Sequence, residues 1–234
     1  MNLIFKALSG SKAYGLDSEN SDTDIRGVFI TDKIQEIFGL RKRECQKGEG
    51  EDELYYEFKH FLNLLRNGNT TAIEMLYTKN PIITCSFWKG LDPKKLIDPN
   101  RLFSSLIGYC HGEKRVANGE RTGRLGSKRK EAIDKYGFSP KNFVQLLRLC
   151  YCGQYFLHYG EFPIDLRDFG TIRSKLLPIK FAPEQFNKDE LNNLVDIEMG
   201  MLKDSFDKSE IKNQFKFNEE YIDSLLKEVY HSYI

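Results

Sequence analysis

The sequence predicts an α+β protein: a small sheet with helices over residues 1–95, followed by a mainly helical part over residues 96–234. Two observations support this division. Short runs rich in β-branched and aromatic residues, separated by turn-forming residues, lie within residues 2–58. Beyond residue 58 the apolar residues recur three and four positions apart, which is the period of an amphipathic helix.

Three strands are predicted in the first part. Residues 2–8 (NLIFKAL) form an apolar-rich run that ends at a Ser9–Ser11 turn. Residues 16–24 are polar and turn-forming, and the second strand follows at 25–30 (IRGVFI). Residues 39–53 are charged and contain glycine, which predicts a surface loop, and residues 52–58 (DELYYEF) predict the third strand.

Helices are predicted from the point where the period changes. One amphipathic face is expected from Phe58 to Leu65, closed by residues 67–69, and Thr70 or Thr71 is expected to cap a short helix over 72–77. The Pro- and Gly-containing stretch 80–100 predicts a hinge between the two parts. A longer helix is expected to begin at Ser139-Pro140, with Pro140 as its first residue, and to end at Gly160, because proline favours a first helical turn and glycine a helix end.

Composition narrows the class of protein. Of the 234 residues 40% are hydrophobic and 29% charged, which is typical of a globular chain. The net charge of +1 favours no class of partner, so an argument for nucleic acid must rest on local clusters. Five cysteines without a paired framework predict reduced thiols. No run approaches the roughly 20 apolar residues that span a bilayer, and we expect a cytoplasmic protein without membrane contact.

The most specific pattern is a Gly10-Ser11 pair followed, after residues 12–21, by Asp22-Thr23-Asp24 at the start of the second strand. A strand has a period of two, so Asp22 and Asp24 are expected on one face, where the two carboxylates repel each other unless a cation lies between them. Magnesium prefers oxygen ligands and binds through one or two carboxylates plus substrate phosphates. An acid-x-acid pattern alone also fits a polar turn. The Gly-Ser pair, the spacing and the following strand favour the metal site.

The Gly-Ser pair suggests the partner of that metal. Glycine lets a backbone approach a triphosphate closely, while free N–H groups and the Ser11 hydroxyl supply hydrogen-bond donors. Together these features predict two-metal phosphoryl or nucleotidyl transfer, in which one ion activates the attacking hydroxyl and the other neutralises the leaving pyrophosphate.

The segment GSKAYGLDSENSDTDIRGVFI resembles the signature of the DNA polymerase β-like nucleotidyltransferases, in particular a bacterial and phage branch associated with RNA repair. The segments DELYYEFKHFLNLLRNGNTTAIEMLY, KYGFSPKNFVQLLRL and GEFPIDLR resemble later parts of that branch, so the similarity covers most of residues 8–168. Two positions depart from the branch: Asn69-Thr70 replaces Asn-Pro, and His60 replaces a lysine. Both affect expected substrate contacts and leave the acid pair intact.

The resemblance implies a cofactor and a set of acids. It implies Mg²⁺ or Mn²⁺, as two ions, held by Asp22, Asp24 and a third acid from a neighbouring strand. Asp52 is the favoured third acid, while Glu53 and Glu57 lie on the other strand face and are the alternatives. Glu74 matches a further acid of the branch on a helix, where it is expected to support the metal ligands from behind. For each of these acids a solvated surface position is the competing interpretation.

The nucleotide is expected to meet Gly10 and Ser11 at its triphosphate and Tyr14 at its base or ribose, although Tyr14 also fits simple packing beneath the turn. Lys141 and Arg148, seven residues apart on one helical face, are candidates for phosphate contacts. A salt-bridged helix face is their alternative. Residues 112–135 carry eight Lys or Arg against four Asp or Glu. This excess fits either an RNA backbone or a solvated face.

The predicted function is transfer of a nucleoside monophosphate from an NTP to an acceptor hydroxyl, most plausibly at a tRNA-like RNA 3′ end, with release of pyrophosphate. Adenylylation of a protein hydroxyl, as in toxin–antitoxin relatives, is the second hypothesis. A catalytically silent RNA- or nucleotide-binding module is the third. The oligomeric state has no signature in the sequence.

Overall fold

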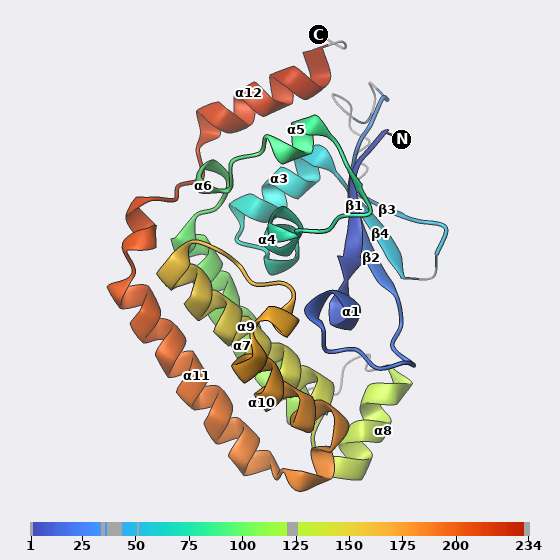
Figure 1. Cartoon of the computed structure of the whole chain (residues 1–234), viewed down its shortest axis with the longest axis vertical. Helices are drawn as coiled ribbons and strands as arrows, with labels where there is room; N and C mark the ends of the chain where they lie inside the picture. The colour runs from blue at the N-terminus through green and yellow to red at the C-terminus, as the bar shows by residue number, and fades with distance from the viewer. Residues whose placement is uncertain (1, 34–35, 37–43, 51, 121–125, 232–234) are drawn as a thin grey trace. The chain divides into compact units, whose positions relative to one another are not determined.

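The computed structural model describes residues 2–33, 36, 44–50, 52–120 and 126–231. The chain forms two compact units. The first unit contains Met1–Leu102 together with Lys212–Ile234, and the second contains Phe103–Ile211. Figure 1 colours the chain from blue to red, and the first unit contains both the dark blue strand β1 and the red helix α12. Predictions that fall on residues 37–43 and 121–125 lie outside the described residues.

The first unit is built on a mixed five-stranded sheet in the order β3-β4-β2-β1-β5. Its strands are β1 Asn2–Ser9, β2 Asp24–Ile30, β3 Cys45–Lys47, β4 Glu53–Glu57 and β5 Ile83–Thr84. Strands β2 and β4 run parallel, and the other pairs are antiparallel. The strands predicted at 2–8, 25–30 and 52–58 are confirmed. Strand β3 lies within the segment predicted as a loop. Its three residues are too few to show an alternating pattern, so the prediction missed it.

Helices α1 Gly10–Tyr14, α3 Phe58–Arg66, α4 Thr70–Tyr77, α5 Ser86–Lys89 and α6 Pro93–Leu96 follow in the first unit. The apolar face predicted for α3 is buried, with Phe58, Phe61 and Leu65 fully enclosed. The aromatic ring of Phe5 in β1 stacks on Trp88 of α5, with ring centroids 4.2 Å apart. The prediction that Thr70 or Thr71 caps α4 is wrong, because the Asn69 side chain accepts the hydrogen bond from the Ala72 N–H.

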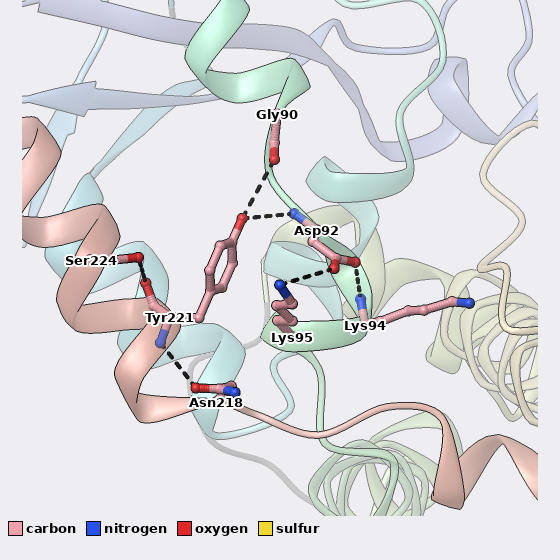
Figure 2. Close-up of polar contacts among 7 residues, drawn as sticks. All are labelled: Gly90, Asp92, Lys94, Lys95, Asn218, Tyr221 and Ser224. Atoms are coloured by element: carbon pink, nitrogen blue, oxygen red, sulfur yellow. Dashed lines mark hydrogen bonds and ion pairs between the residues drawn. The ribbon is translucent and has the colours of Figure 1, made fainter.

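Helix α12, Glu219–Tyr230, completes the first unit, and Figure 2 shows its attachment. The Tyr221 hydroxyl accepts a hydrogen bond from the Asp92 N–H at 3.1 Å and donates to the Gly90 carbonyl at 3.4 Å. The Lys95 ammonium lies 5.0 Å from the centre of the Tyr221 ring. The sequence-based division groups residues 212–234 with the helical part, whereas they belong to the unit that contains the sheet. As functional domains, 1–95 and 96–234 stay predictions.

The second unit is helical. It contains most of α7 Pro99–Ala117, then α8 Ser127–Tyr136, α9 Pro140–Tyr159, α10 Gly170–Phe181 and α11 Lys188–Lys208, with short 3₁₀ turns η1 Leu166–Asp168 and η2 Pro183–Gln185 before η3 Glu210–Asn213. Helix α9 packs against α10 and α11 (Figure 1). Its predicted start at Pro140 and end at Gly160 are confirmed.

The close packing around α9 depends on a glycine and two thiols. A Cβ at Gly153 would lie 2.7 Å from Leu106 Cδ1 and 2.9 Å from Leu202 Cδ1, so a larger residue would force these leucines of α7 and α11 away from α9. The sulfurs of Cys110 and Cys150 lie 3.7 Å apart in the same interior as free thiols. In the part of the chain that the structure describes, no helix is both long and apolar enough to cross a membrane.

Candidate metal and nucleotide site

The Gly10-Ser11 pair does not form the predicted turn but begins the one-turn helix α1. Both ends of this helix need glycine, because Gly10 has a φ of +63° and Gly15, which ends the helix, has a φ of +66°. These values lie in the left-handed region, where a side chain is strained. The sequence GSKAYG therefore places a short helix directly after β1, with backbone geometry that only glycines adopt easily at its two ends.

Gly10 lies against the carboxylate of Asp24. A Cβ at residue 10 would sit 2.1 Å from Asp24 Oδ2 and 2.9 Å from its Cγ, so a side chain there would displace the Asp24 carboxylate. The strand pairing explains the contact, because Ser9 and Asp24 are opposite each other where β1 and β2 begin to separate. The glycine is thus required by its backbone conformation and, independently, by the acid it faces.

Strand β2 begins at Asp24, and Asp22 lies before it in an irregular, exposed segment. The prediction that strand alternation places both carboxylates on one face is therefore wrong for Asp22, since alternation applies only within a strand. Asp24 is half-buried. The two acids remain two residues apart, one fixed by the sheet and one on the loop that leads into it.

Asp52 lies beside Asp24 in the parallel pairing of β2 with β4. Ile25 pairs with Glu53, which places Asp24 and Asp52 one residue earlier at matching positions. The Asp52 carbonyl accepts hydrogen bonds from the Ile25 N–H at 3.1 Å and from Arg26 Nη1 at 3.0 Å. Asp52 itself occupies the exposed turn before β4. The pairing thus brings the backbone of the favoured third acid to the strand that carries Asp24.

The two alternative acids are occupied elsewhere. Glu57 is buried and caps α3, with Oε2 accepting from the Lys59 N–H at 2.8 Å and the His60 N–H at 3.2 Å. The Tyr230 hydroxyl donates to its other oxygen. Because Glu57 pairs with Phe29 in the ladder, it lies on the opposite face of the sheet from Asp24. These contacts give Glu57 a structural role at the start of α3.

Glu53 forms an ion pair with Lys6, with 3.1 Å between the Lys6 Nζ and Glu53 Oε1. The Tyr55 hydroxyl also donates to Glu53, and together Tyr55 and Lys6 hold the pKa of the Glu53 carboxyl below its ordinary value. The same contacts raise the pKa of Lys6. As the third acid Asp52 stays a prediction, and it is the acid of the three whose position in the pairing of β2 with β4 matches that of Asp24.

The donor chemistry of the site suits a hard cation. Asp22, Asp24 and Asp52 offer carboxylate oxygens, which Mg²⁺ and Mn²⁺ prefer, and two of the three side chains are exposed to solvent and substrate. Over the described ranges, with their gaps, no group of three or more His, Cys, Asp or Glu side chains is gathered closely enough to hold an ion by itself. The residue types therefore suit Mg²⁺ or Mn²⁺, but they do not form a closed metal site by themselves, and the ion stays a prediction.

Tyr14 and Lys12 connect α1 to its surroundings. The Tyr14 hydroxyl donates to Glu74 Oε2 at 2.8 Å, and Glu74 is buried on α4. The Lys12 ammonium donates to the Thr23 hydroxyl, between Asp22 and Asp24 in the chain. Sequence reasoning did not single out Lys12, and the only signal for it was its position directly after Ser11.

Lys141 and Arg148 lie on α9 in the second unit, with different exposure. Lys141 is exposed in the first turn of the helix, whereas Arg148 is fully buried and its Nε donates to Gln145 Oε1 at 3.1 Å. Their spacing places them on one side of the helix as expected, but only Lys141 meets solvent. Their contact with a nucleotide stays a prediction.

The basic stretch between residues 112 and 135 divides between helix α8 and the end of α7. Lys114 pairs with Asp196, with 2.6 Å between Lys114 Nζ and Asp196 Oδ1. Lys128, Lys130 and Lys135 are exposed along α8. The described part of the positive excess therefore includes a lysine in an ion pair and lysines that are exposed along α8.

Comparison with known proteins supports the resemblance. Residues 1–92 match the model of the RlaP family, described as "RNA repair pathway DNA polymerase beta family". The chain is also 24% identical, over 123 residues, to the "Uncharacterized 38.9 kDa protein in nrdC-mobD intergenic region" of Enterobacteria phage T4. That match covers 47% of this chain and 37% of the phage protein. No solved structure matches. The family match confirms the resemblance for the segment that contains Gly10, Asp24, Asp52 and Glu74.

Proposed function

Because residues 1–92 match the RNA repair type of the DNA polymerase β family, we propose that the chain transfers a nucleoside monophosphate from an NTP to an acceptor hydroxyl and releases pyrophosphate. The observation that carries this proposal is the contact of Gly10 with the Asp24 carboxylate. The Gly10 backbone, which carries no side chain, lies beside the Asp24 carboxylate on the sheet. A metal-bound polyphosphate could therefore approach the backbone and the acid together.

Asp22, Asp24 and Asp52 are the proposed ligands of two Mg²⁺ or Mn²⁺ ions. Such ions, when bound, polarise the attacking hydroxyl and offset the charge of the leaving pyrophosphate. Asp24 contributes a position fixed by β2 and by Gly10. Asp22 and Asp52 lie on exposed segments next to it in the chain and in the sheet, where solvent and an arriving ion can reach them.

Gly10 and Ser11 are the proposed contacts of the triphosphate, through backbone N–H groups and the Ser11 hydroxyl. Lys141 and Arg148 are the proposed phosphate contacts from the helical unit, with Arg148 requiring a local rearrangement because it is buried. Glu74 supports this arrangement from α4 through Tyr14.

The proposed acceptor is an RNA 3′ end. The matching family is described by its role in an RNA repair pathway, and exposed lysines along α8 suit a phosphate backbone. An RNA acceptor and a protein acceptor differ in one simple observation, because label transferred to RNA is lost on ribonuclease treatment.

The test is incubation of the full chain with Mg²⁺ and each α-labelled NTP, with and without RNA, while label transfer and pyrophosphate are measured. We expect transfer by the wild type and loss of transfer in Asp24→Asn. The matched control is Asp223→Asn, which removes an exposed charge from α12 in the same unit. Equal transfer by wild type and Asp24→Asn, or no transfer with any NTP and acceptor, contradicts the proposal.

A further inference from the structure

Helix α1 has little intrinsic stability. It contains five residues, none of them buried, and one helical turn in isolation is unfavourable because nucleation fixes several residues for one hydrogen bond. Its position must therefore be set by contacts with the rest of the first unit. That position matters because Gly10, its first residue, faces Asp24.

Two side-chain hydrogen bonds connect α1 to other segments of the first unit. Lys12 donates to Thr23, on the loop that carries Asp22 and leads into Asp24. Tyr14 donates to Glu74, sixty residues further along the chain, at 2.8 Å. The first contact is exposed to solvent, while the second is partly buried. The tyrosine contact is thus the stronger candidate for fixing α1.

Glu74 occupies a buried, well-packed position on α4. Its side chain is 6% exposed, and its neighbours Ala72, Ile73 and Met75 on α4 are buried in the core of the first unit. The Asn69 cap fixes the start of α4. A buried carboxylate needs hydrogen-bond donors, so the Tyr14 hydroxyl has a strong preference for this acceptor over a solvent-exposed position.

We propose that Tyr14 and Glu74 are a positioning pair, which sets α1 so that Gly10 and Ser11 meet the NTP beside Asp24. The inference rests on the proposed function and sharpens it: Tyr14 acts through its hydroxyl on Glu74 and not by stacking on the base or ribose. Its removal changes the position of the triphosphate contacts and leaves the acids in place.

Three variants distinguish the contribution of the Tyr14 hydroxyl from that of its aromatic ring. Tyr14→Phe keeps the ring and removes the donor, and Glu74→Met removes the acceptor at similar size. Glu74→Gln keeps an acceptor oxygen. We expect Tyr14→Phe and Glu74→Met each to raise the KM for NTP at least about tenfold, because small misplacements of binding groups have large effects. The double variant should be no worse than either single variant, and Glu74→Gln should remain close to wild type.

The matched control is Tyr221→Phe, which removes a tyrosine hydroxyl of the same unit whose two hydrogen-bond partners, Asp92 and Gly90, are outside α1 (Figure 2). A readout independent of catalysis is amide hydrogen exchange of residues 10–16. Exchange there should increase in Tyr14→Phe and Glu74→Met and stay unchanged in Tyr221→Phe. Unchanged exchange in Tyr14→Phe overturns the positioning pair, whether or not the chain transfers nucleotides.

The two proposals fail differently. If wild type transfers nucleotide and Tyr14→Phe has the wild-type KM, the positioning pair is wrong and the proposed function stands. If Tyr14→Phe binds normally but Tyr14→Leu does not, Tyr14 acts by stacking. If wild type transfers nothing while exchange at residues 10–16 responds as expected, the pair holds α1 and the proposed function is wrong.

Discussion

The α-carbon of Gly10 lies against the carboxylate of Asp24, at the point where β1 ends and β2 begins. The contact joins the two halves of the sequence pattern that singled out this region, although residues 11–23 separate them in the chain. It also makes the glycine sensitive to substitution for two independent reasons, a left-handed φ and a neighbouring acid.

Gly10→Ala should destabilise the first unit and disturb Asp24. A Cβ in the left-handed region costs about 1–2 kcal/mol, and this Cβ also displaces the Asp24 side chain. The comparison is Gly137→Ala, at a φ of +78° with no atom within 4 Å of the added Cβ, which incurs the backbone cost alone. Denaturant unfolding should show the larger loss for Gly10→Ala. Equal losses would mean that Asp24 moves aside freely.

Tyr230→Phe should weaken the attachment of α12. The Tyr230 hydroxyl donates to the buried Glu57 carboxylate, and removal of a donor from a buried acceptor costs about 1–3 kcal/mol. Tyr221→Phe removes a more exposed hydroxyl and should cost less, about 0.5–1.5 kcal/mol. Denaturant unfolding of both variants, monitored in the first unit, measures the two losses of stability. A larger loss for Tyr221→Phe would contradict the assignment of Glu57 as a buried structural acid.

The Glu53 cluster gives the stability of the first unit a pH dependence. Tyr55 and Lys6 lower the pKa of Glu53, so the stabilisation is present above the ordinary carboxyl pKa and is lost as pH falls through the lower, folded value. Thermal unfolding measured from about pH 6 down to about pH 3 should therefore show a smaller loss of stability in Glu53→Gln than in wild type. Parallel curves for the two proteins would show that Glu53 has no favourable partner in the folded state.

Lys141 and Arg148 should respond differently to substitution. Lys141 is exposed, so Lys141→Ala should change the free energy of unfolding by no more than about 0.5 kcal/mol while raising the KM for NTP. Arg148 is fully buried, and Arg148→Ala should destabilise the second unit by about 1–3 kcal/mol through lost packing and hydrogen bonding. Unfolding and steady-state kinetics of both variants check this. A stable Arg148→Ala with a raised KM would make Arg148 a direct phosphate contact.

The long periodic segments were predictable from the sequence because local signals agree there. Strand β2, helix α3 and helix α9 combine a clear apolar period with recognisable ends, such as the Pro140 start and Gly160 end of α9. Strands β3 and β5 have three and two residues, and pairing with neighbouring strands, not local sequence, determines them.

The arrangement of the site was only partly predictable. The acid pair and the glycine were found from spacing, but the strand boundary at Asp24 leaves Asp22 outside the alternation on which the prediction rested. The contact of Tyr14 with Glu74 joins residues sixty positions apart, and the capping of α3 by Glu57 involves Tyr230 near the other end of the chain. Contacts at this separation depend on tertiary packing and have no signature in a single sequence.

The most direct test of the central claim is release of pyrophosphate from each NTP by the full chain with Mg²⁺ and RNA, compared between wild type and the Asp22→Ala/Asp24→Ala variant. The account predicts release by wild type, dependence on the added metal ion and loss in the variant, with both proteins equally folded. Equal release by the two proteins, or none by wild type with any NTP, would contradict it.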